Sequence, residues 1–129
     1  MLAKVDPLQD APGDQDNVQV LMSEIRGNQN AHGLLVMRSG ERSGERFSLT
    51  LDRVEIGRNP ECTVCLDDVT VSRRHAELRL GSDGYLLTDM GSLNGTYVNQ
   101  ERVEEILLQN GDELQVGKYR MVFFDGASN

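Results

Sequence analysis

The chain has 129 residues, enough for one domain with a single core, and its 38% hydrophobic and 26% charged residues are ordinary for a globular protein. The formal net charge of −8 and the pI of about 4.7 argue against binding to nucleic acid or to an anionic membrane, because both partners require a basic surface. No apolar run approaches the roughly 18 residues of a membrane-spanning helix, and no secretory signal is visible, so we expect a cytoplasmic protein.

Residues 1–32 differ in composition from the remainder of the chain. They contain Pro7 and Pro12 and are rich in Asp, Asn and Gln. Such a segment buries too little apolar surface to offset the entropy lost on ordering, so we interpret it as a flexible N-terminal tail. A small apolar patch at residues 18–22 interrupts it, and this patch either docks on another surface or stays unattached.

From Gly33 onward, short runs of β-forming residues alternate with turn signals. In the second run Phe47, Leu49 and Leu51 recur at every other position, which predicts that all three face a core. The expected strands are residues 34–38, 46–51, 54–57, 63–66, 75–80, 85–89, 96–98, a run near 103–108, 113–116 and 120–124.

Within this part of the chain no window of ten or more residues has the apolar spacing of an amphipathic helix. About ten or eleven short strands with regularly spaced turns are typical of an all-β sandwich, and links this short require mostly antiparallel pairing. We therefore predict one β-sandwich domain over residues 33–125 and a short C-terminal tail at residues 126–129.

Cys62 and Cys65 form a C-x-x-C pair, a spacing found in redox and zinc sites. A closed zinc site needs four ligands, however, and the sequence contains no second pair. Residues three apart on a strand point to opposite faces. We therefore interpret Cys65 as a small core residue and Cys62 as facing a loop, and expect neither a metal nor a cofactor.

Two loops, residues 57–75 and 89–99, contain more polar chemistry than a turn requires. If both lie at one end of the sandwich, they bring together the side chains of Arg58, Ser72 and Arg73. Such a set suits a phosphate monoester, because guanidinium groups match its oxygens, a hydroxyl adds a hydrogen bond, and loop N–H groups can fill the remaining acceptors. Taken singly, each residue also has a structural explanation, such as a solvated Arg or a Ser that caps a turn.

The ordered combination resembles the forkhead-associated (FHA) family. The family pattern is Gly-Arg at the end of an early strand, then Ser-x-x-His, then Asn-Gly-Thr and a further Asn. In this chain the pattern is matched by Gly57-Arg58, Ser72-Arg73-Arg74-His75, Asn94-Gly95-Thr96 and Asn99. The resemblance covers roughly residues 33–125 and implies an FHA/SMAD-like sandwich that binds phosphothreonine peptides.

The resemblance also implies a role for each matched residue. Arg58 and Ser72 would bind the phosphate, Arg73 would assist, and Asn94 would hydrogen-bond the peptide backbone. The remaining matched residues would shape the loops or contact the peptide: Gly57, His75, Gly95, Thr96 and Asn99. His75 in particular is expected to brace the binding loop.

Within the family, the segments 66–77 and 91–99 resemble the small bacterial regulators GarA (glycogen accumulation regulator) and OdhI (oxoglutarate dehydrogenase inhibitor). The resemblance implies binding to metabolic enzymes, switched off when a phosphorylated tail threonine folds back onto its own domain. This tail departs from that pattern, because Thr50 is the first threonine of the chain and Ser23 is the only hydroxyl residue before residue 33.

Two functions therefore remain open. The chain is either a phosphothreonine reader that acts downstream of a Ser/Thr kinase, with a kinase or kinase substrate as partner, or a phosphate-independent regulator of a metabolic enzyme such as 2-oxoglutarate dehydrogenase. The only histidines are His32 and His75, and no nucleophile, base and orienting group occur at sensible spacing. We therefore expect a binding protein rather than an enzyme.

Overall fold

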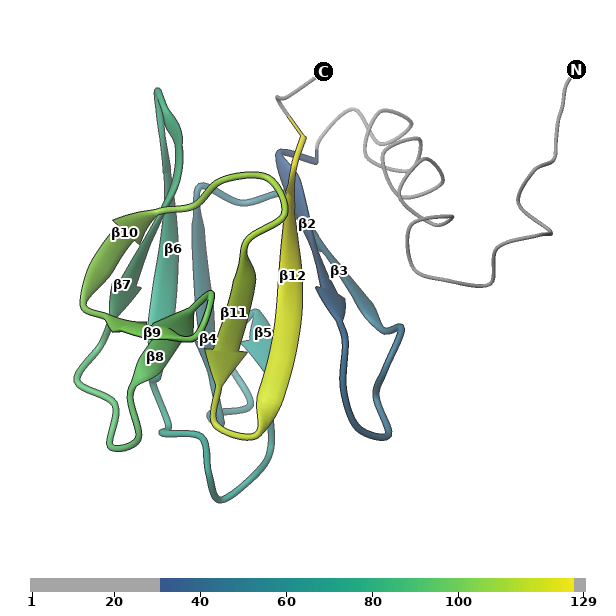
Figure 1. Ribbon diagram of the computed structural model, residues 1–129, viewed down its shortest axis with the longest axis vertical. Coiled ribbons are helices and arrows are strands. Elements are labelled where there is room, and N and C mark those ends of the chain that lie inside the picture. Colours follow the sequence, from purple (N-terminus) through teal and green to yellow (C-terminus); the bar gives the residue numbers. More distant parts are fainter. Residues whose placement is uncertain (1–30, 127–129) are drawn as a thin grey trace, which may run out of the picture.

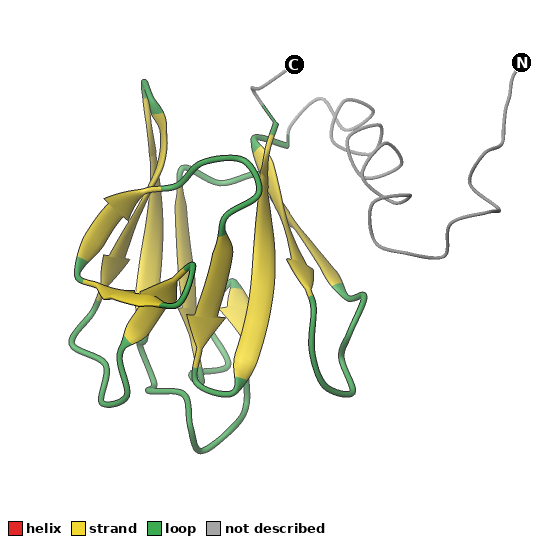
Figure 2. Ribbon diagram, viewed as in Figure 1, coloured by secondary structure: helices red, strands yellow, loops and turns green. Residues whose placement is uncertain are grey.

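Eleven short strands make up the regular structure of residues 31–126, the part of the chain that the computed structural model describes (Figure 2). Most of the predicted N-terminal tail, and residues 127–129 of the predicted C-terminal tail, lie outside the described residues. The strands are β2 (Gly33–Met37), β3 (Arg46–Leu49), β4 (Arg53–Gly57), β5 (Val64–Cys65), β6 (Ala76–Gly81), β7 (Gly84–Asp89), β8 (Thr96–Val98), β9 (Glu101–Val103), β10 (Glu105–Leu107), β11 (Glu113–Val116) and β12 (Tyr119–Asp125). No helix occurs among these residues, and so no helix here could cross a membrane.

The strands form two sheets that pack face to face (Figure 1). One sheet has the order β10-β7-β6-β4-β5 and the other the order β3-β2-β12-β11-β8-β9. All neighbours pair antiparallel except β4 and β5, which are parallel. The predicted all-β sandwich of mostly antiparallel strands is therefore confirmed.

Two details of the strand prediction are wrong. Leu51 does not face the core: strand β3 ends at Leu49, the chain then turns toward β4, and the Leu51 side chain is 51% exposed. The single run predicted near residues 103–108 is two strands, β9 and β10, on either side of Glu104. Strand β9 pairs with β8 and β10 with β7, so the chain crosses here from one sheet to the other.

The inward side chains of both sheets form one core. Strands β4, β7 and β11 alternate between buried and more exposed residues, the period-two pattern of a sheet with one buried face. Tyr85 and Phe123 meet across the sandwich edge to face, with ring centroids 6.1 Å apart and an interplanar angle of 83°. The core thus joins the sheets through aromatic and aliphatic contacts.

The interpretation of Cys65 as a core residue is also wrong, whereas Cys62 does face a loop. Cys62 is the buried member, and its Sγ donates to the Arg73 carbonyl at 3.5 Å. Cys65 is half-buried, and its Sγ donates to the Arg58 carbonyl at 3.8 Å. The reason is that β5 comprises only Val64 and Cys65, and Val64 supplies its fully buried side chain. Cys62 precedes the strand, in a turn that folds beneath the Arg73 backbone.

Strand direction gathers the polar loops at one end of the sandwich. The segments after β5 and β7 and the β11–β12 hairpin all lie at the end opposite to the start of β2 and the end of β12 (Figure 1). Both loops singled out in the sequence therefore reach the same end of the molecule. We call this the loop end.

The buried phenol of Tyr85 generates a prediction about alkaline stability. Its hydroxyl donates to the Leu51 carbonyl at 2.8 Å, and burial, with a smaller contribution from Asp52, raises the pKa of Tyr85 from the usual 10 to about 12. The stability that the neutral phenol contributes is therefore complete below pH 10 and is lost as the pH rises toward 12. We expect the wild type to lose about 2–3 kcal/mol more than Tyr85→Phe over this interval.

The measurement is urea unfolding at several pH values between 9 and 12 for both proteins. Tyr85→Phe should start about 0.5–1.5 kcal/mol less stable, because it lacks the hydrogen bond to Leu51. The two curves should then approach each other and cross as the pH rises toward 12, because the expected loss exceeds the initial difference. Parallel curves would contradict the prediction.

Candidate functional site

Arg58 and Ser72 are fourteen residues apart in the chain but side by side in the structure. The Arg58 N–H donates to the Ser72 carbonyl at 3.0 Å, and the Asn59 N–H donates to the Arg73 carbonyl at 3.1 Å. The Arg58 side chain is oriented by Nε, which donates to the Val71 carbonyl at 3.0 Å. Among residues 31–126, the two terminal nitrogens of this guanidinium have no protein partner, so both are available to an anion.

This close approach of the two segments requires glycine at position 57. A Cβ on Gly57 would lie 2.2 Å from the Arg73 carbonyl oxygen and 3.1 Å from Cys62 Sγ. The first distance is far below van der Waals contact with a backbone atom, which cannot move aside as a side chain would. Gly57 therefore lets the Arg58 backbone pair with the loop that contains Ser72 and Arg73.

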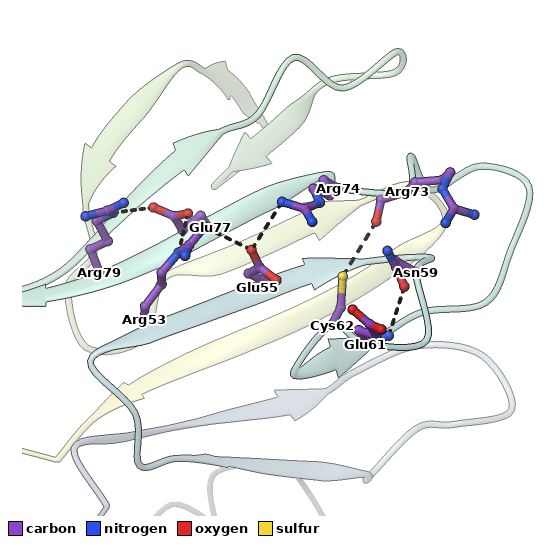
Figure 3. A network of polar contacts seen from close by, with 9 residues as sticks. All are labelled: Arg53, Glu55, Asn59, Glu61, Cys62, Arg73, Arg74, Glu77 and Arg79. Atoms are coloured by element: carbon purple, nitrogen blue, oxygen red, sulfur yellow. Dashed lines mark hydrogen bonds and ion pairs between the residues drawn. The ribbon is translucent and has the colours of Figure 1, made fainter.

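Arg73 and Arg74 are neighbours, but their side chains diverge (Figure 3). Arg74 points to Glu55, with Nη1 3.8 Å from a carboxylate oxygen, and joins a network of paired charges on the outer face of the sheet. In that network Glu77 accepts hydrogen bonds from Arg79 and Arg53. Arg73 points away from the network, is exposed, and forms no ion pair with any described residue.

The ring of His75 joins the two loops. It is fully buried, and its Nδ1 accepts a hydrogen bond from the Ser72 N–H at 3.0 Å. Its Nε2 lies 2.8 Å from the Gly95 carbonyl. Because Nδ1 accepts, Nε2 must carry the proton and donate it to that carbonyl. One imidazole thus fixes the backbone beside Ser72 relative to the backbone beside Asn94.

Ser72 and Asn94 also link the loops and still have groups to offer a ligand. Ser72 Oγ accepts from the Leu93 N–H at 3.0 Å, which leaves its hydroxyl proton free to be donated. Asn94 Nδ2 donates to the Thr70 carbonyl at 3.0 Å, which leaves its Oδ1 as an acceptor for a peptide N–H. The structure therefore brings four predicted residues to the loop end: Arg58, Ser72, Arg73 and Asn94.

Asp89 organises the second loop, and the sequence reasoning gave it no role. One carboxylate oxygen accepts from the Gly91 and Ser92 N–H groups, and the other accepts from the Ser92 and Thr96 hydroxyls at 2.5 and 2.7 Å. Burial alone would raise the pKa of Asp89, but these hydrogen bonds outweigh it and lower the pKa. The signal was present in the order Asp-Met-Gly-Ser, because Asp commonly accepts from N–H groups two or three residues ahead.

Thr96 and Asn99, two of the predicted residues, hydrogen-bond to the framework of the domain, Thr96 from a buried position and Asn99 from an exposed one. Thr96 is fully buried and donates to Asp89, so its side chain has no access to a peptide. Asn99 lies past the far end of β8, in the turn to β9, with φ of 51°. Its side chain donates to Asp112 and accepts from the Glu113 N–H, both at 3.0 Å. Both residues hold the strands beneath the loops.

A third segment, the β11–β12 hairpin, lies beside these loops and lines a groove with them. The sequence reasoning did not include it. The Lys118 N–H donates to Thr70 Oγ1 at 3.0 Å, and Lys118 Nζ lies 3.2 Å from Asp68. Hydrogen bonds from Thr70, helped by Lys118, lower the pKa of Asp68 to about 2. A groove of about 550 Å³ opens beside this contact and is lined by Thr70, Asn94, Gly95, Tyr97, Gln100, Gln115, Gly117, Lys118 and Arg120.

Two apolar side chains project from the loops. Val69 is 94% exposed and precedes Thr70, and Leu93 is 86% exposed and precedes Asn94. The sequence reasoning missed both. The available signal was an apolar residue inside a loop rich in polar residues, directly before a polar residue of the site. Each stands next to a residue that lines the groove.

The amino-acid sequence is similar to those of known proteins. The family model described as "FHA domain" matches residues 54–117. The chain is 47% identical over 117 residues to the glycogen accumulation regulator GarA of Mycobacterium tuberculosis, covering 91% of this chain and 72% of that protein. It is 48% identical over 103 residues to the oxoglutarate dehydrogenase inhibitor of Corynebacterium jeikeium, covering 80% and 72%.

Solved structures agree in fold and in sequence. An FHA domain studied for phosphothreonine-dependent interactions superposes with a TM-score of 0.66 at 34% identity, covering 71% of this chain and 94% of that one. The FhaA FHA domain, solved with the intracellular domain of Rv3910, gives a TM-score of 0.65 at 34% identity, covering 70% and 98%. The fold, the ordered motif and these similarities lead to one conclusion: the chain belongs to the FHA domain family.

Proposed function

We propose that the protein binds phosphothreonine peptides at the loop end, with Arg58 and Ser72 on the phosphate, Arg73 beside it and Asn94 on the peptide backbone. It acts in this proposal as a cytoplasmic signalling module downstream of a Ser/Thr kinase, by binding and not by catalysis. Its partner is a phosphothreonine-containing protein, either the kinase or one of its substrates.

The observation that carries the proposal is that two guanidinium groups, those of Arg58 and Arg73, form no ion pair with residues 31–126 in a protein of net charge −8. Arg53, Arg74 and Arg79 all lie against carboxylates, whereas Arg58 and Arg73 have no such partner among the described residues. A dianionic phosphate with three acceptor oxygens would meet two guanidinium groups and the free hydroxyl proton of Ser72. The neutral amide of Asn94 then suits the uncharged backbone beside the phosphate.

Arg58→Ala is the direct test of this arrangement. The change removes one side of a desolvated charge pair, so phosphopeptide affinity should fall by about 2–5 kcal/mol. Arg58→Lys keeps the charge without the planar fork and should lose less. The peptide is first selected from an oriented phosphothreonine library with phosphoserine controls, and affinity is then measured by calorimetry.

Arg74→Ala is the matched control, because it removes an adjacent guanidinium that faces Glu55 and not the loops. The phosphopeptide affinity of this variant should stay near that of the wild type, because Arg74 does not face the loops. Its folding should also change little, since an exposed ion pair of this kind contributes about 1 kcal/mol or less to stability. Unchanged affinity for Arg58→Ala, or an equal loss for Arg74→Ala, would remove the proposal.

Asp89 generates a second prediction, about positioning and not contact. In Asp89→Asn an NH₂ group replaces one of the oxygens to which the loop donors point, so donors face each other. We expect a loss of about 1–3 kcal/mol in unfolding free energy and weaker phosphopeptide binding. Urea unfolding and calorimetry measure the two effects.

The matched control for Asp89→Asn is Asp83→Asn, which changes an exposed carboxylate in the β6–β7 hairpin, away from the loop end. It should alter neither quantity. If Asp89→Asn also leaves stability and affinity unchanged, the role of Asp89 in shaping the loop is refuted.

A second candidate function is phosphate-independent regulation of a metabolic enzyme through the same loops. The observation that favours it is the exposure of Val69 and Leu93, because apolar side chains beside a groove suit a protein partner better than solvent. The similarity to a protein named oxoglutarate dehydrogenase inhibitor suggests the corresponding enzyme as the partner.

A pull-down from phosphatase-treated extract separates the two functions. If the second holds, the wild type retains the metabolic enzyme after phosphatase treatment, and the pair Val69→Ser with Leu93→Ser releases it. Leu51→Ser is the control, because Leu51 is also exposed but lies in the β3–β4 turn away from the loop end. Loss of the enzyme on phosphatase treatment favours phosphothreonine binding alone.

A further inference from the structure

The outer face of the second sheet contains an apolar patch that is separate from the core. Its members are Leu34 and Val36 on β2 and Val122 and Phe124 on β12. Leu34 pairs with Phe124, and Val36 pairs with Val122, so the four side chains form a compact square on one face. We call this square the outer patch.

The outer patch is buried, although it points away from the other sheet. Its side chains retain 2–9% of their exposure, close to the values of the core. Their chain neighbours Leu35 and Phe123 point into the sandwich, which fixes the patch on the opposite face. The strands beside β2 and β12 lie in the same sheet and cannot cover its face.

No described segment is placed to cover the outer patch. All eleven strands of residues 31–126 belong to the two sheets, and the other sheet packs against the inner face. An occupant of the outer patch would therefore come from outside this range. Residues 1–30 join the described part immediately before β2, which contains half of the outer patch.

We propose that residues 18–25 of this chain dock on the outer patch as an amphipathic helix. Val18, Leu21, Met22 and Ile25 have the spacing i, i+3, i+4 and i+7, which places them on one side of a helix. The residues between them, which are polar except for Val20, would face solvent. The four apolar side chains on the docking side thus match four in the outer patch.

The connecting chain is long enough for this arrangement. Residues 26–32 can span about 23–25 Å when extended, whereas five residues of β2 extend about 17 Å. A helix of eight residues is about 12 Å long and can lie back over β2 and β12. Arg46 pairs with Val36 at the rim of the patch, and Glu24 in the segment supplies an opposite charge.

A second copy of the chain is a weaker occupant. Four aliphatic and aromatic side chains offer on the order of a few hundred Å² of apolar surface, below the roughly 800 Å² per partner of a stable protein interface. A segment of the same chain needs less area, because the linker holds it at an effective concentration in the millimolar range. This docking would also need no phosphate, which fits a tail without threonine.

Methyl NMR of the full-length protein tests the proposal. The wild type should show NOEs between methyl groups of residues 18–25 and those of Leu34, Val36 and Val122. In Leu21→Asp with Ile25→Asp, the remaining NOEs from the segment should vanish and the patch methyls should shift. Neither substitution falls in a strand of the sandwich, so phosphopeptide binding reports that the domain is still folded.

Val20→Asp is the matched control, because Val20 lies in the same segment but on the opposite side of the helix. It should preserve the NOEs, as should Arg58→Ala, so this result does not depend on the phosphothreonine site. Three results would overturn the proposal: no NOEs in the wild type, their loss in Val20→Asp, or NOEs that appear only between differently labelled copies. The last result would identify a second copy as the occupant.

Discussion

The loop end depends on one buried imidazole. The two hydrogen bonds of His75 join the loop that contains Ser72 to the loop that contains Asn94, and the bonds from Leu93 to Ser72 and from Asn94 to Thr70 reinforce this contact at the surface. With them, a hydroxyl and an amide from distant parts of the chain are held in one arrangement before any ligand arrives. Binding then costs less ordering entropy, because the site is already assembled. Gly57 contributes in the same way, by allowing Arg58 to approach the first of these loops.

Two carboxylates in the loops of this acidic protein are engaged in hydrogen bonds within the fold. Asp89 and Asp68 both lie in the loops, but each is occupied by hydrogen bonds from its own loop, and Asp68 also pairs with Lys118. Both pKa values are lowered, so both groups are ionised and turned to structural use at neutral pH. Arg58 and Arg73 are left without a competing internal anion among the described residues.

The two outer faces of the sandwich differ in chemistry. The β4–β6 face contains paired charges, with Glu77 between Arg53 and Arg79 (Figure 3). The β2–β12 face contains the apolar outer patch, although both belong to sheets with the same core. Paired charges satisfy one another and suit a face open to water, whereas an apolar face of this kind needs a cover. The molecule therefore has a ligand end, a solvent face and a face suited to its own N-terminal segment.

The sequence by itself determined the fold class, most strand positions and the family, because period-two patterns, turn residues and an ordered motif are local properties. It also singled out Arg58, Ser72, Arg73 and Asn94. Only the tertiary structure decided that Arg74 lies against Glu55, which cysteine is buried, and that the side chains of Thr96 and Asn99 bond to the framework of the domain. It alone revealed the roles of Asp89, Lys118 and the outer patch. Side-chain direction in loops and contacts between distant strands depend on packing, which no local pattern of residues encodes.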